Sequence, residues 1–120
     1  MTITPQELVA DAKSKIRELD PAEAVQSINS GAQVLDVREP AEFDAGKLAG
    51  AVNIPRGVLE FKIADHPGLA DKNAAIVLYC KTGGRSALAT LSLQQLGYNN
   101  VHSVRGGFEA WVNGGHPVEK

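Results

Sequence analysis

The sequence predicts an α/β domain in which a mostly parallel sheet of about five short strands lies between helices on both faces. Two observations support this fold class. Short apolar runs alternate along the chain with segments whose apolar residues recur at helical spacing, and this alternation is typical of a parallel sheet covered by helices. The chain has 120 residues, a length that suits one domain with its own hydrophobic core.

The predicted strands are short apolar runs that end at turn-forming residues. Pro40 and Pro55 each end a run, because proline lacks the backbone donor that a strand needs. Strands are predicted over residues 33–38, 51–55, 76–79 and 101–104, and a short edge strand over 16–19.

Two of the predicted helices begin with the same signature. Thr4-Pro5-Gln6-Glu7 and Asp20-Pro21-Ala22-Glu23 each combine a capping residue, a proline and a glutamate three residues after the cap. They predict a helix over 5–15 and a second helix that ends near Gly31. Further helices are predicted over 41–46, 58–64, 85–96 and 108–112. Leu88, Leu91 and Leu96 form the predicted apolar stripe of the helix over 85–96, and residues 114–117 are expected to be a tail.

Composition excludes several classes of function. The net charge of −2 provides no general basic field, so we expect no nucleic-acid partner. A single cysteine rules out a disulfide within the chain and suits a reducing compartment. No apolar run approaches the length of a membrane helix, and residues 1–7 do not resemble a signal peptide. We therefore expect a cytoplasmic protein with no membrane contact.

The strongest functional signal follows the strand at 76–79. Cys80 stands at its carboxyl end, where open α/β sheets place their ligand sites, and the polar loop after it opens a helix. The helix N-terminus, the charges of Lys81 and Arg85 and the flexible pair Gly83 and Gly84 all favour a thiolate within a ring of backbone N–H groups. We predict Cys80 as the catalytic nucleophile and list the expected substrate-binding residues as Lys81, Thr82, Gly83, Gly84 and Arg85.

Three further residues are expected to support this site. Asp36 and Arg38 lie two residues apart on a strand, so their side chains share one face. We interpret them as a structural ion pair that braces the loops. Ser86 stands near a helix start, where its hydroxyl can cap the helix or hold the loop.

The sequence predicts no metal site and no cofactor. One cysteine and the separated histidines His66, His102 and His116 do not match zinc-ligand spacings. Neither a dinucleotide-binding glycine motif nor a phosphate-binding P-loop motif is present.

Four segments in order resemble the rhodanese-type sulfurtransferases. Residues 80–85 resemble the active loop of that family, and 36–43, 46–55 and 105–111 resemble its other motifs. The resemblance implies a three-layer rhodanese-like domain over 18–120, preceded by a helical extension over 1–17. The family pattern often has a histidine where this chain has Lys47, a departure outside the loop.

The resemblance implies a thiosulfate sulfurtransferase. Cys80 would take a sulfane sulfur from a donor such as thiosulfate and pass it, as a persulfide, to a thiol or cyanide. Because the chain has no second cysteine, the acceptor must come from outside, either a small molecule or a protein, and a monomer is the simplest expectation.

Two alternatives stay open. The domain acts as a persulfide carrier or regulatory module for a protein partner, or it is a cysteine-dependent phosphatase or arsenate reductase. The last class has one residue more between its cysteine and arginine than the four found here, and this sequence offers it no obvious aspartate general acid.

Overall fold

A five-stranded, wholly parallel sheet forms the middle layer of the computed structural model, which describes residues 2–120. The strands lie in the order β1-β5-β4-β2-β3. Because β4 is central and both its faces are buried, its four residues are all apolar or aromatic. The strands are β1 (Glu18–Leu19), β2 (Gln33–Asp36), β3 (Val52–Asn53), β4 (Ile76–Tyr79) and β5 (Val101–Val104).

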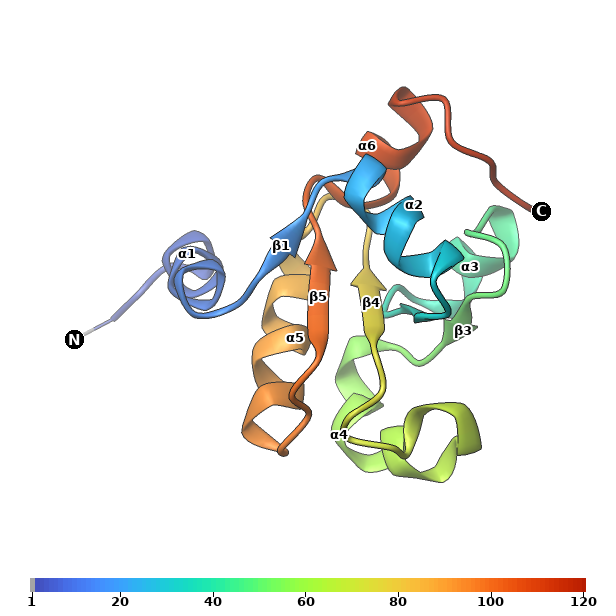
Figure 1. Ribbon diagram of the computed structural model, residues 1–120. Coiled ribbons are helices and arrows are strands. Elements are labelled where there is room, and N and C mark those ends of the chain that lie inside the picture. The colour runs from blue at the N-terminus through green and yellow to red at the C-terminus, as the bar shows by residue number, and fades with distance from the viewer. Residues whose placement is uncertain (1) are drawn as a thin grey trace.

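Helices cover both faces of the sheet, as predicted (Figure 1). The α-helices are α1 (Pro5–Lys15), α2 (Pro21–Asn29), α3 (Pro40–Ala45), α4 (Leu59–Lys62), α5 (Gly84–Gln95) and α6 (Gly107–Asn113), and the 3-10 turns are η1 (Arg56–Val58), η2 (Ile63–Asp65) and η3 (Pro67–Leu69). None of the helices within residues 2–120 is long and apolar enough to cross a membrane.

Each face of the sheet has its own core. On one face, Leu35 and Leu78 of the sheet pack with Leu93 of α5 and with the α4 region. On the other, Val77 and Tyr79 pack with α2 and with Trp111 of α6. Alternate residues of β4 thus serve opposite cores, as the two-residue period of a strand requires.

The predicted helix starts of α1 and α2 are confirmed. The backbone N–H of Glu7 donates to the Thr4 hydroxyl at 3.0 Å, and that of Glu23 donates to the Asp20 carboxylate at 2.9 Å. α1 packs against α5, beside the edge strand β1 (Figure 1). The proposed division of the chain at residue 17 stays a prediction.

The structure corrects two predicted helices. The segment expected as one helix over 58–64 is three short pieces, η1, α4 and η2. In α5 the predicted stripe is wrong: Leu88 and Leu91 are half-buried, and Leu96 is exposed because it caps the helix beyond its last turn. The buried residues of α5 are instead mostly small, which lets the helix approach the sheet closely: Ser86, Ala87, Ala89, Thr90 and Leu93.

The segment predicted as a tail folds back onto the domain. The indole N–H of Trp111 donates to the carbonyl of Pro117 at 2.8 Å. Further on, Glu119 and Lys47 exchange backbone hydrogen bonds of 2.7 and 2.8 Å in an antiparallel bridge.

Candidate active site

Cys80 lies at the carboxyl edge of the sheet, immediately after the central strand β4. It is 1% exposed, so only a slender reactant reaches its sulfur. The backbone N–H of Gly83 donates to Sγ at 3.1 Å. The loop therefore turns back on itself and brings a backbone donor to the sulfur.

The loop also offers backbone donors that no group of the described residues uses. The N–H groups of Thr82, Gly84, Arg85 and Ser86 have no acceptor within residues 2–120. Three of them belong to the first turn of α5, where a helix leaves its N–H groups unpaired. Such a turn attracts an anion.

A second glycine turn holds the loop from outside. The N–H groups of Phe108 and Glu109, at the start of α6, donate to the carbonyls of Cys80 and Lys81 at 2.8 and 3.0 Å. Gly107 has φ +59°, and a Cβ there would lie 2.5 Å from the carbonyl oxygen of Cys80. The turn therefore closes over the same edge of the sheet, and only glycine fits at position 107.

The variant Gly107→Ala is expected to lose about 3 kcal/mol of stability, from left-handed strain and the overlap with the loop carbonyls. We also expect it to lose activity beyond the loss of folded protein, because the loop must move. Gly50→Ala is the matched control: Gly50 has φ +76° but nothing within 4 Å of an added Cβ. Urea denaturation and the rate of the reaction that depends on Cys80 check both, and equal effects in the two variants would refute the role of the close approach.

Ser86 connects the loop to the neighbouring strand β5. Its buried hydroxyl donates to the carbonyl of Gly83 at 3.3 Å and lies 2.8 Å from the hydroxyl of Ser103 on β5. Gly83, not Ser86, caps α5, and it has φ +107°. The expected loop-holding role of Ser86 agrees with these contacts, and Ser103 joins it as a partner that the sequence analysis missed.

Arg85 is held by a residue that the sequence analysis did not select. Its two terminal nitrogens lie 2.7 and 3.0 Å from the two carboxylate oxygens of Glu42 on α3. The hydrogen bonds from Arg85 lower the pKa of Glu42 to about 2, so this carboxylate stays ionised at neutral pH. The pair is about one-third exposed, and Arg85 is therefore not the free cation that the sequence suggested.

The Asp36–Arg38 ion pair is present and buried. The guanidinium of Arg38 makes contacts of 2.7 to 3.1 Å with both carboxylate oxygens of Asp36 and donates to the carbonyl of Gly46 at 2.6 Å. It also lies over the ring of Phe108, 4.5 Å from the centroid. Burial alone would lower the pKa of Arg38. The hydrogen bonds and the negative charge of Asp36 have a larger effect, so the pKa of Arg38 is raised. The pair joins β2 to α3 and α6, as the bracing interpretation requires.

Lys81 and Thr82 are both exposed at the rim of the loop. The structure thus brings Cys80, Gly83, Gly84 and Ser86 together, with Arg85 turned to Glu42 and the Asp36–Arg38 pair at the end of the adjoining strand β2. No group of three histidine, cysteine, aspartate or glutamate side chains within residues 2–120 is arranged to hold a metal ion.

Fold and site together define a three-layer α/β protein whose one cysteine begins a loop at a helix N-terminus. The chain belongs to the rhodanese-like domain family, whose model matches residues 20–114.

Relatives and a solved structure agree with this assignment. A protein named sulfurtransferase from Allochromatium vinosum is 32% identical over 105 residues, covering 86% of this chain and 94% of that protein. Thiosulfate sulfurtransferase GlpE of Pseudomonas aeruginosa is 35% identical over 95 residues, 79% of this chain and 83% of that protein. A structure from Rhodopseudomonas palustris, described as a protein of unknown function and possible tyrosine phosphatase, matches with TM-score 0.88 and 34% identity over 99% of this chain and 96% of its own.

Proposed function

We propose that this protein is a sulfurtransferase that takes sulfane sulfur from a donor such as thiosulfate and carries it on Cys80 to an outside acceptor. The observation that carries the proposal is the loop after Cys80. There a backbone N–H donates to the sulfur at 3.1 Å, and further N–H groups have no acceptor within the described residues 2–120. The sulfurtransferase names of the relatives support the same chemistry.

Two displacement steps complete the reaction. The Cys80 thiolate attacks the outer sulfur of thiosulfate, a new S–S bond forms, and sulfite leaves with the electron pair of the bond that breaks. The acceptor, a thiolate or cyanide, then attacks the outer sulfur of the persulfide and releases the Cys80 thiolate. This is a two-step covalent mechanism of ping-pong type.

The loop N–H groups have a defined part in this scheme. They stabilise the negative charge of the thiolate and of the persulfide, at a helix end where an anion is favoured. Lys81, exposed at the rim, attracts the donor anion. Arg85 attracts the donor anion less strongly while it is paired with Glu42, because the carboxylate offsets the charge of the guanidinium.

Replacing Glu42 by glutamine should therefore favour donor binding. Without the carboxylate, Arg85 keeps its full charge near the loop, and we expect the KM for thiosulfate to fall several-fold at low ionic strength. Stability should drop by no more than about 1 kcal/mol, because the pair is partly exposed. Steady-state kinetics check this, with Glu39→Gln as control: Glu39 is an exposed neighbour that makes no hydrogen bond to Arg85. An unchanged or higher KM in Glu42→Gln would contradict the masking of Arg85.

The direct test of the proposed function is the mass of the intact protein after incubation with thiosulfate. We expect a gain of one sulfur atom that cyanide removes, and no gain in the Cys80→Ser variant. If no sulfur is gained from thiosulfate, polysulfide and persulfide donors are tried next. Failure with every sulfane-sulfur donor would refute the proposal.

A cysteine-dependent phosphatase is the second candidate, because the matched structure from Rhodopseudomonas palustris is described as a possible tyrosine phosphatase. The loop has four residues between Cys80 and Arg85, which makes a smaller cradle and favours a single sulfur atom over a tetrahedral oxyanion. Hydrolysis of p-nitrophenyl phosphate that is lost in Cys80→Ser would support this candidate.

The partners follow from the single cysteine. No second thiol in the chain can receive the sulfur, so we propose an external thiol acceptor, small or protein-borne, for a monomer that works in the cytoplasm. If the acceptor is a protein, the domain is a persulfide carrier, and transfer to small thiols would then be slow.

A further inference from the structure

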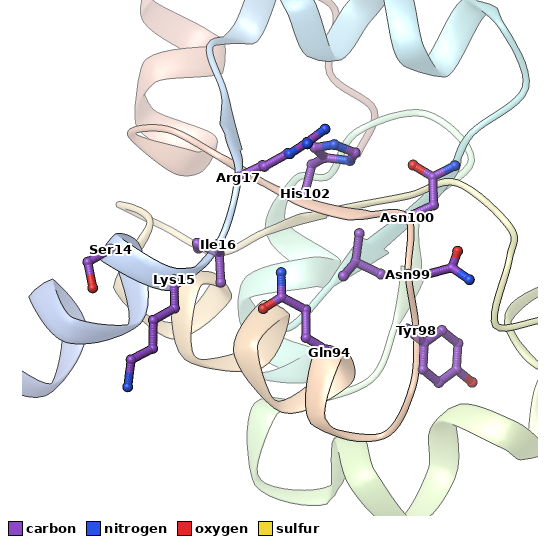
Figure 2. Close-up of a pocket in the computed structure, with 10 residues that line it drawn as sticks. Ser14, Lys15, Ile16, Arg17, Gln94, Tyr98, Asn99, Asn100 and His102 are labelled. Atoms are coloured by element: carbon purple, nitrogen blue, oxygen red, sulfur yellow. The ribbon is translucent and has the colours of Figure 1, made fainter.

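A cavity lies at the other end of β5 from the Cys80 loop. It has a volume of about 380 Å³ and is formed by residues 14–17, at the end of α1 and just before β1, and by the end of α5 with the start of β5 (Figure 2). Its size is at the lower end of the range of small-molecule sites. The site proposed for sulfur transfer uses none of its residues.

The charge of this cavity differs from that of the whole chain. Its only charged lining residues are Lys15 and Arg17, both cationic, although the chain as a whole carries −2. Lys15 has a partner, since its Nζ lies 3.2 Å from Asp11. Within residues 2–120, no carboxylate lies within 4 Å of the Arg17 guanidinium.

Several polar side chains around Arg17 are also unpartnered. Figure 2 shows Arg17 and His102 close to each other, with the amide of Gln94 rising toward them from α5. Within the described part of the chain, the side chains of Arg17, His102, Gln94 and Asn100 make no hydrogen bond to another group. Burial and then the charge of Arg17 lower the pKa of His102, which agrees with their closeness.

We propose that this cavity binds a small organic anion, with its phosphate or carboxylate group between Arg17 and His102. The guanidinium supplies a bidentate, charged donor set. Neutral His102 donates one ring N–H, and the amides of Gln94 and Asn100 bond to polar groups on the rest of the molecule. Such an anion would pair with the Arg17 guanidinium. It would also accept hydrogen bonds from side chains that have no partner within the described residues.

The histidine resonances provide the test, because the chain has only three histidines. Inorganic phosphate, glycerol phosphate and glutarate are titrated separately at about pH 7.5, where histidine is mainly neutral, with ionic strength held constant by chloride. We expect saturable shifts of the His102 ring signals with at least one of the three, and no comparable shifts of His66 and His116. The phosphate and carboxylate arms distinguish the two head groups.

Variants separate this site from general ionic effects. Arg17→Gln should weaken binding about tenfold or more, since it removes a charged hydrogen-bonding partner. Arg105→Gln is the matched control, because Arg105 is an exposed arginine just beyond the opposite end of β5, and it should leave the His102 titration unchanged. The proposal is overturned if no anion shifts His102 selectively or if Arg17→Gln binds as tightly as the unmodified chain.

Discussion

Replacing Cys80 by serine is expected to reduce sulfur transfer by a factor of about a thousand or more, because a serine hydroxyl cannot form the persulfide. The fold should remain. A serine oxygen is an acceptor at nearly the same position, so the N–H of Gly83 that now donates to Sγ keeps a partner. Formation of thiocyanate from thiosulfate and cyanide measures the activity.

Cys80→Ala is the informative companion variant. It removes the nucleophile and also leaves the buried Gly83 N–H without an acceptor, which costs about 1 to 3 kcal/mol. We therefore expect the alanine variant to be as inactive as the serine variant and less stable in urea. Equal stability of the two would show that the Gly83 contact contributes little. Transfer at a rate close to that of the unmodified protein in either variant would refute Cys80 as the nucleophile.

The variant Arg38→Met should lose about 3 to 5 kcal/mol of stability, because it leaves a buried carboxylate without its counter-ion. Asp36 is fully buried and Arg38 is 4% exposed. After the change, the only hydrogen bond that Asp36 keeps from residue 38 is the one from the backbone N–H at 2.8 Å. Urea denaturation at neutral pH measures the loss.

A double variant tests whether the unpaired charge is the cause. Asp36→Leu combined with Arg38→Met removes both charges, and replacing a buried pair by apolar residues is often nearly neutral. The double variant should therefore be more stable than Arg38→Met alone. If it is no more stable, the loss in Arg38→Met comes from the missing contacts of Arg38 with Gly46 and Phe108 and not from the unpaired charge.

Local sequence signals predicted most of the fold. The capping boxes of α1 and α2 each lie within four consecutive residues. The continuous apolar run of β4 indicates a strand that is buried on both faces. The Asp36–Arg38 pair was predicted from two residues on one strand sharing a face; the pair is present, although β2 ends at Asp36 and Arg38 lies in the bend just beyond it. These features depend on neighbours in the sequence, so the sequence displays them.

The features that were missed depend on residues far apart in the chain. Glu42 and Arg85 are 43 residues apart, and their pairing requires α3 and α5 to meet at one sheet edge. The available signal was that Glu42 follows a strand whose carboxyl end reaches this edge. The stripe of α5 was wrong for a similar reason: close packing on the sheet selects Ala87 and Ala89 over the leucines, which hydrophobicity alone does not indicate.

The order of strands has a consequence for synthesis on the ribosome. Within residues 2–120, β1 pairs only with β5, so residues 18–19 cannot pair until residues 103–104 have been synthesised. The turn that holds the Cys80 loop comes later still, at 106–109. Contacts between such distant parts of a chain form late, and domains fold as units once they are complete. Until almost the whole chain has emerged, the thiol of Cys80 lacks the cover that buries it in the finished domain. The nascent protein therefore passes through a period in which its reactive sulfur is open to oxidants and to other thiols.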